Sequence, residues 1–116
     1  MKIKGYTLHG DYYLADNVIP NKTWKEACEM KEEITLSNGK KVVAHTLSKE
    51  ELESIPSEER SCDKWYWTST PGDDKYAWGV NYGGVFYDYI FDSSNDIGGI
   101  RLGFHKNEIK QFLDIE

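Results

Sequence analysis

The side chains of this sequence that could perform covalent chemistry are two cysteines, with histidines that could serve as bases. Cys28 and Cys62 are the only cysteines, and they lie far apart in the chain. A nucleophilic thiol needs a base close to it in space, and His45 or His105 could supply one. Two cysteines without a neighbouring cysteine or histidine make a poor zinc site, and free thiols are the usual state in a reducing compartment. We therefore predict that the protein is not an enzyme, has no catalytic residue and needs no cofactor.

Carboxylates in two polar segments are the second group of candidates. Asp73 and Asp74 lie in one segment, and Asp92 and Asp96 lie in another. Calcium takes six to eight oxygen ligands, so these side chains would form a site only if the two loops met. Acidic loops are more often simply solvated. We predict no metal site, and calcium binding stays an open alternative.

Arg101 is the third candidate, because a guanidinium can bind the anion of a ligand. An arginine within a strand more often ties a loop together through its forked donors. We favour this structural role.

The overall composition limits the kinds of partner. The 116 residues form a single domain (1–116), with 20 acidic and 14 basic residues and a net charge of −6. This charge argues against direct binding of nucleic acid, and it indicates either plain solubility or an acidic surface that meets a basic partner. No apolar run is long enough to span a membrane, and residues 1–10 lack the apolar stretch of a signal peptide. We expect a cytoplasmic protein that binds no membrane, in the host cytoplasm if it is phage-encoded.

The first half of the sequence predicts strands and two capped helices. Residues 6–15 indicate two short strands around a turn at His9 and Gly10. Thr23 with Glu26 forms a capping box that begins a helix over 23–34, and residues 37–41 form a turn before a strand at 42–44.

The second helix is predicted by an even clearer signal. Ser48 with Glu51 forms a capping box, and Leu47 with Leu52 forms a hydrophobic staple. Pro56 ends this helix, and a polar loop follows.

Aromatic residues dominate the segment after this loop. Residues 65–69 indicate a strand, and a hairpin with its turn at Gly83 and Gly84 follows. In that register, one face of the hairpin carries Tyr76, Trp78, Val80, Tyr82, Val85, Tyr87, Tyr89 and Phe91. The other face carries Ala77, Gly79, Asn81, Phe86, Asp88 and Ile90. A final strand over 98–104 and a short helix over 106–114 complete the chain.

The second face of this hairpin is the predicted binding site. Its centre is Asn81, Phe86 and Asp88, and the flanking loops add Asp73, Asp74 and Asn95. A mixed apolar and polar face of this kind suits a protein partner if it is exposed, and it is simply core if another segment covers it.

The order of these motifs resembles the C-type-lectin-like domains of bacteria and their phages. This branch includes formylglycine-generating enzymes and the variable domains of diversity-generating retroelements. The motifs are TWKEACEMKEEI, VVAHTLSKEELESI, WYWTST and YAWGVNYGGVFYDYIFDSSNDIGGIRLGF. The resemblance implies an α+β fold in which the first and last strands pair, and two helices flank two small antiparallel sheets.

The resemblance also assigns positions within that fold. It implies that Trp24, Trp67, Trp78 and Val80 are core residues, and that Arg101 is the arginine of the terminal strand. Two features depart from the family. His45-Thr46-Leu47 replaces the usual Leu-Pro-Thr before the second helix, and no cysteine follows the terminal arginine.

The function expected from these features is non-enzymatic binding of a protein, by a phage or bacterial interaction module. One alternative is a phage-encoded inhibitor whose acidic surface covers the basic nucleic-acid site of a host defence protein. Another alternative is an enzyme-like remnant of the formylglycine-generating type. The oligomeric state stays open.

Overall fold

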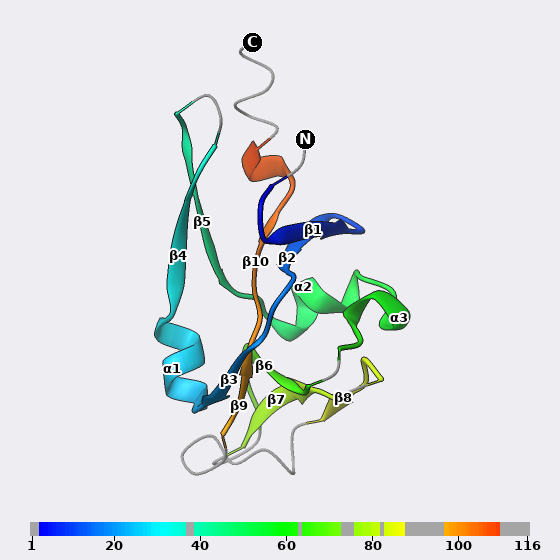
Figure 1. The fold of residues 1–116 in the computed structure, drawn as a ribbon. Helices are drawn as coiled ribbons and strands as arrows, with labels where there is room; N and C mark the ends of the chain where they lie inside the picture. Colours follow the sequence, from blue (N-terminus) through cyan, green and yellow to red (C-terminus); the bar gives the residue numbers. More distant parts are fainter. Residues whose placement is uncertain are drawn as a thin grey trace.

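The described chain is built around two five-stranded sheets (Figure 1). The computed structural model describes residues 3–36, 39–62, 64–72, 76–81, 83–87 and 97–109, without the side chain of Tyr87. The strands are β1 (Tyr6–His9), β2 (Tyr12–Ala15), β3 (Ile19–Lys22), β4 (Lys31–Thr35), β5 (Lys41–Thr46), β6 (Tyr66–Pro71), β7 (Ala77–Val80), β8 (Phe86–Tyr87), β9 (Gly98–Ile100) and β10 (Leu102–His105). The helices are α1 (Trp24–Glu29), α2 (Lys49–Glu53) and α3 (Ser57–Arg60).

The predicted fold, α+β with two helices flanking two small antiparallel sheets, is wrong. Strands predominate in the described residues, and each helix has only four to six residues. The first sheet has the order β1-β2-β10-β5-β4 and is antiparallel throughout. The second sheet has the order β3-β9-β6-β7-β8 and is mixed, because β6 and β9 run parallel.

Two chain segments pass through both sheets and join them. One segment forms β2 and then β3, and the other forms β9 and then β10, with Arg101 between them. The two segments pair with each other twice, as β2 with β10 in the first sheet and as β3 with β9 in the second. Figure 1 shows them side by side through the middle of the molecule. The expected single strand over 98–104 is therefore two strands, one in each sheet.

The helix predicted over 23–34 ends early, although its start is correct. Thr23 and Glu26 form the expected capping box, but the helix stops at Glu29. Residues 31–35 instead form the edge strand β4, which pairs along its whole length with β5. Ile34 and Thr35 are β-branched and lie opposite Val42 and Lys41. Pairing with β5 thus overrides the helical spacing of this segment.

The second helix matches its prediction, and the segment after it does not. Ser48 and Glu51 form the capping box of α2, and Leu52 and Ile55 are buried. The residues predicted as a polar loop begin with the short helix α3, which Pro56 precedes as its N-cap. Proline is tolerated at this position because its missing N–H lies outside the hydrogen bonds of the helix.

The core consists of two clusters of buried side chains. The larger cluster includes Tyr13 and Phe104, whose rings stack with their centroids 5.1 Å apart, and fully buried Trp67. Ala27 of α1 belongs to this cluster. The smaller cluster holds α2 against the sheets and contains Leu14, Leu47, Leu52, Ile55, Tyr66 and Val80.

The family-implied core positions are only partly buried. Trp67 and Val80 are completely buried. Trp24 and Trp78 are half-buried, and the indole N–H of Trp24 donates to the Thr68 carbonyl at 2.9 Å. At the C-terminal end, residues 107–109 form a helical turn with Ile109 buried, and the rest of the helix predicted over 106–114 lies outside the described residues.

The predicted register of the hairpin is wrong by one residue. Val80 pairs with Phe86, and Gly79 pairs with Tyr87, whereas the sequence suggested that Val80 faces Tyr87. The connection is a three-residue loop instead of a two-residue turn, because Asn81 and Val85 are joined by a backbone hydrogen bond of 2.9 Å. A slip of one residue exchanges the two faces of a strand. The predicted pairing of Val80 with Tyr87 is therefore wrong, while Tyr82, Tyr89 and Phe91 of the predicted aromatic face lie outside the described residues.

Gly84 fixes both the shape of this loop and its contact with α3. Its φ is +79°, a left-handed conformation that favours glycine in three-residue hairpin loops. A β-carbon at this position would lie 2.2 Å from the Ser57 carbonyl oxygen. Gly83, by contrast, has room, since the nearest atom to its added β-carbon is Asn81 Oδ1 at 3.6 Å.

Replacing these two glycines separately tests the loop. Gly84→Ala should lower the free energy of unfolding by about 2–5 kcal/mol, because it combines backbone strain with a clash against fixed backbone. Gly83→Ala should change it by less than about 1 kcal/mol. Urea unfolding of both variants measures the difference. Equal stabilities for the two variants would show that the turn does not rest on α3.

Candidate functional site

Only two of the six predicted binding residues fall within the described chain. These are Asn81 and Phe86. Asp73, Asp74, Asp88 and Asn95 lie outside the described residues, so their predicted role stays a prediction. The observed register also separates the two that are described. Asn81 lies opposite Val85, and Phe86 lies opposite Val80. Because these two pairs are neighbours along the strands, Asn81 and Phe86 lie on opposite faces of the hairpin.

The side chain of Asn81 organises the hairpin loop. Its Oδ1 atom accepts hydrogen bonds from the backbone N–H of Gly83 at 2.9 Å and of Val85 at 3.0 Å. Asparagine commonly stabilises turns in this way. Because this oxygen already accepts two hydrogen bonds within the loop, the NH₂ group of Asn81 is the part of its amide that is left to bind a partner.

The ring of Phe86 lies beside two cationic side chains. The Arg60 guanidinium carbon is 4.6 Å from the ring centroid, and Lys49 Nζ is 5.4 Å from it. Lys49 Nζ also lies 4.7 Å from the centroid of the Trp78 ring. Both aromatic residues are half-buried. We call the group formed by Lys49, Glu50, Glu53, Trp78 and Phe86 the helix–hairpin surface.

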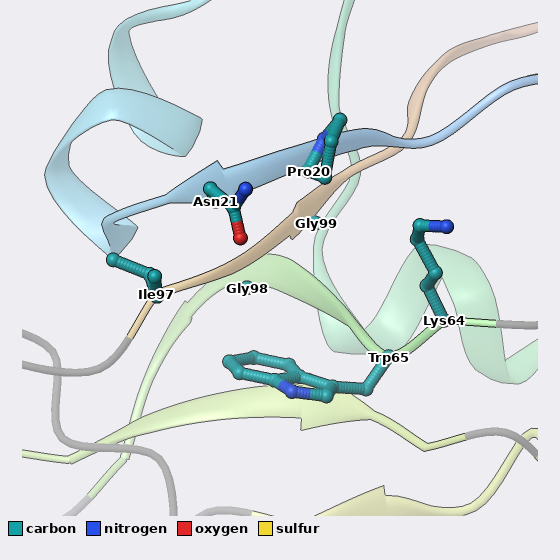
Figure 2. A pocket seen from close by; sticks show the side chains of 7 residues that line it. All are labelled: Pro20, Asn21, Lys64, Trp65, Ile97, Gly98 and Gly99. Atoms are coloured by element: carbon teal, nitrogen blue, oxygen red, sulfur yellow. The ribbon is translucent and has the colours of Figure 1, made fainter.

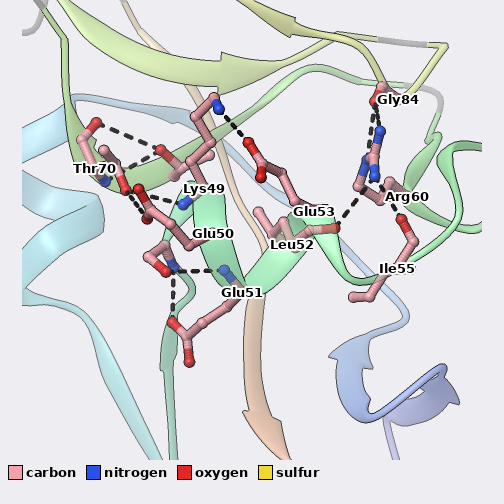
Figure 3. Close-up of polar contacts among 11 residues, drawn as sticks. Lys49, Glu50, Glu51, Leu52, Glu53, Ile55, Arg60, Thr70 and Gly84 are labelled. Atoms are coloured by element: carbon pink, nitrogen blue, oxygen red, sulfur yellow. Dashed lines mark hydrogen bonds and ion pairs between the residues drawn. The ribbon is translucent and has the colours of Figure 1, made fainter.

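Lys49 of this surface and Arg60 beside it are both engaged within the protein, as Figure 3 shows. Lys49 forms an ion pair with Glu53 one helical turn later. Arg60 donates to the Gly84 carbonyl from Nε at 3.0 Å and from Nη2 at 2.9 Å. Its Nη1 atom donates to the carbonyls of Leu52 and Ile55. The guanidinium therefore binds the hairpin loop to the end of α2.

Glutamates surround these engaged cations. Helices α2 and α3 contain Glu50, Glu51, Glu53, Glu58 and Glu59. Glu51 is used in the capping box, and Glu59 lies 3.4 Å from His9 Nδ1. Glu50 accepts a hydrogen bond of 3.3 Å from Thr70 and remains exposed. The surface is thus aromatic at its centre and acidic at its edge.

The residues considered for catalysis make local contacts. Nδ1 of His45 lies 3.1 Å from the Thr46 carbonyl, and Nδ1 of His105 accepts from the Asn107 N–H at 3.0 Å. Partial burial raises the pKa of the Cys28 thiol, and the negative charge of Glu29 raises it further. A raised pKa keeps the thiol protonated and weakens it as a nucleophile. Within the part of the chain that the structure describes, no group of three or more histidine, cysteine, aspartate or glutamate side chains could hold a metal ion.

Arg101 makes the structural contacts that its sequence position favours. It is only 8% exposed, and its Nε donates to the Ala15 carbonyl at 3.0 Å. Its Nη1 donates to the Arg60 carbonyl at 3.2 Å, an acceptor that it shares with the Tyr66 hydroxyl. The guanidinium thus joins β2, the end of α3 and β6.

A small pocket lies beside Trp65 at the end of the second sheet (Figure 2). Its volume is about 170 Å³, and Pro20, Asn21, Lys64, Ile97 and the glycines at 98 and 99 complete its lining. A β-carbon on Gly98 would lie 2.2 Å from the indole of Trp65, so this glycine lets the ring lie against the strand. No motif of the sequence analysis predicted this pocket.

A larger pocket of about 400 Å³ opens where the two sheets meet. Its lining comes from both sheets and comprises Lys4, Gly5, Tyr6, Ala15, Asn17, Ile19, Glu32, Ile100 and Leu102. The buried Tyr6 hydroxyl donates to Glu32 Oε1 at 2.7 Å. Burial raises the pKa of Tyr6 strongly, and the hydrogen bond to Glu32 and its negative charge raise it further.

Tyr6 should make the free energy of unfolding fall as the pH becomes alkaline. Tyr6 stays protonated in the folded state at pH values where the unfolded chain ionises, so its contribution is complete below about pH 10 and is lost above it. Wild type should therefore lose up to about 1.4 kcal/mol more per pH unit than Tyr6→Phe above about pH 10.

Urea unfolding of both proteins between about pH 8 and about pH 11.5 measures this difference. The other tyrosines are common to the two proteins, so their contribution cancels. Parallel stability curves above about pH 10 would show that the Tyr6 hydroxyl is not held in this hydrogen bond.

Comparison with known proteins assigns this chain to no family: no family model, curated protein or solved structure matches it. The resemblance to C-type-lectin-like domains stays a prediction from the sequence motifs. Among the helices of the described chain, none has the length and apolar character needed to cross a membrane.

Proposed function

We propose that this protein is a non-enzymatic interaction module that binds a protein partner through the helix–hairpin surface. The resemblance to bacterial and phage domains extends the proposal to a bacterial or phage origin. Cys28 and Cys62 form no disulfide bond, which supports a reducing, cytoplasmic location.

The observation that carries the proposal is the pair of half-buried rings beside exposed carboxylates. Trp78 and Phe86 keep part of their surface accessible beneath the Lys49 side chain, and exposed Glu50 and Glu53 lie on the adjoining helix. Aromatic residues are enriched at the centres of protein interfaces, and polar residues form their rims. This surface keeps Phe86 from the predicted binding site. It does not include Asn81, which lies on the other face of the hairpin.

A second candidate function follows from the charge of the two helices. Their basic residues Lys49 and Arg60 are engaged by Glu53 and by backbone carbonyls, which leaves the carboxylates to set the outward potential. An acidic ridge of this kind suits a basic protein surface, including one that normally binds nucleic acid. In that case the protein is a phage-encoded inhibitor of a host defence protein.

Two matched charge reversals test the location of the surface. Glu53 and Glu33 each form one exposed ion pair with a lysine, Lys49 and Lys41 respectively. Glu53→Lys should weaken capture of the partner, because it reverses a charge at the edge of the surface, and Glu33→Lys should leave it unchanged although it alters the net charge equally. Capture from a bacterial lysate, with quantitative mass spectrometry, measures both variants against wild type. Equal capture by the two variants would place the interface elsewhere.

The same capture across a salt series separates the two functions. Raising salt from about 0.1 M to about 1 M shortens the Debye length from about 10 Å to about 3 Å. Binding through the apolar rings should persist across this range, whereas masking of a basic groove should weaken steeply. Persistent binding therefore contradicts the inhibitor function.

A further inference from the structure

The larger pocket between the sheets has the composition of a small-molecule site. Its volume of about 400 Å³ lies within the range of ligand pockets. Buried Ile100 and Leu102 form its floor, and half-buried Ala15 and Ile19 extend this apolar lining. An apolar floor with a few polar groups at the edge is the usual arrangement of such sites.

Three polar groups at this edge have bonding capacity left. No hydrogen bond or ion pair within the described chain engages the Lys4 ammonium or the Asn17 amide. Glu32 receives the Tyr6 hydroxyl on Oε1, which leaves its second oxygen available. All three residues are exposed, so a ligand in the pocket can reach them without a change of fold.

The charges on this edge are of opposite sign and are contributed by different segments. Lys4 precedes β1, and Glu32 lies on the edge strand β4. The Tyr6 hydroxyl fixes the orientation of the Glu32 carboxylate, because the hydrogen bond joins it to a buried ring. The pocket therefore offers a cation, an oriented anion and an amide around an apolar floor.

We propose that this pocket binds a small zwitterion with an apolar side chain, of the class of aliphatic α-amino acids. The ligand carboxylate binds Lys4 and Asn17, its ammonium binds Glu32, and its side chain packs on Ile100 and Leu102. A ligand with only one charge leaves either Lys4 or Glu32 without its partner. This proposal does not rest on the proposed function, since the pocket shares no residue with the helix–hairpin surface.

Titration of the full chain with three related probes tests this proposal. The probes are L-leucine, 4-methylpentanoate, which lacks the ammonium group, and 3-methylbutylamine, which lacks the carboxylate. L-leucine should shift the backbone amide resonances of Gly5, Tyr6 and Asn17 saturably in nitrogen–proton correlation spectra. Each probe with a single charge should bind at least about tenfold more weakly, because it loses a charge-assisted hydrogen bond.

Two variants and one control locate the binding groups. Lys4→Met and Glu32→Gln should each weaken L-leucine binding by about tenfold or more. Glu33→Gln is the matched control, because this neighbour on β4 points to the opposite face, and its binding should equal that of wild type. Dispersed spectra confirm that each variant is folded.

The proposal is overturned by any of three results. These are no saturable shift with L-leucine, equal binding of a probe that carries one charge, or an equal loss in Glu33→Gln. Because Glu53→Lys leaves the pocket intact, its effect on partner capture is independent of this titration.

Discussion

The fold depends on one buried guanidinium at the point where the chain changes sheets. The paired segments that form β2–β3 and β9–β10 run through both sheets, and Arg101 is the residue between β9 and β10. Its donors reach the Ala15 carbonyl on one side and the Arg60 carbonyl on the other. A buried charge is tolerated only when its donors are satisfied, and here two of the guanidinium nitrogens donate to backbone carbonyls at the crossing. This set of hydrogen bonds holds the two sheets and α3 at fixed positions.

The contacts of Arg101 continue to the proposed surface through a second arginine. The Arg60 backbone receives Arg101, and the Arg60 side chain donates to the Gly84 carbonyl of the hairpin loop and packs on Phe86. The position of the hairpin beside α2 therefore follows from the crossing of the sheets. The pocket has the same origin, because Ile19 and Ile100 line it from the second sheet while Ala15 and Leu102 line it from the first.

Local signals in the sequence predicted local structure well. Both capping boxes, the turn at Gly10, the buried Leu52 and the structural role of Arg101 were readable from single residues and short spacings. Three features depended on distant partners and were missed. Residues 31–35 became a strand because β5 pairs with them, and the strand over 98–104 divided because its halves pair with different segments. The register of the hairpin depended on a three-residue loop that Asn81 stabilises. The adjacent glycines Gly83 and Gly84 instead suggested a two-residue turn, although only Gly84 has a positive φ. The larger pocket is formed by both sheets together, so no motif marks it.

Amide hydrogen exchange tests most directly whether Arg101 positions the hairpin. Lysine in place of Arg101 keeps the charge but loses the forked donors. We expect Arg101→Lys to speed exchange of the Gly84 N–H, which donates to the Asn81 carbonyl, more than that of the Leu36 N–H, which donates to the Lys40 carbonyl. Gly84 exchange that is unchanged, or raised no more than that of Leu36, would contradict the claim that this arginine positions the hairpin.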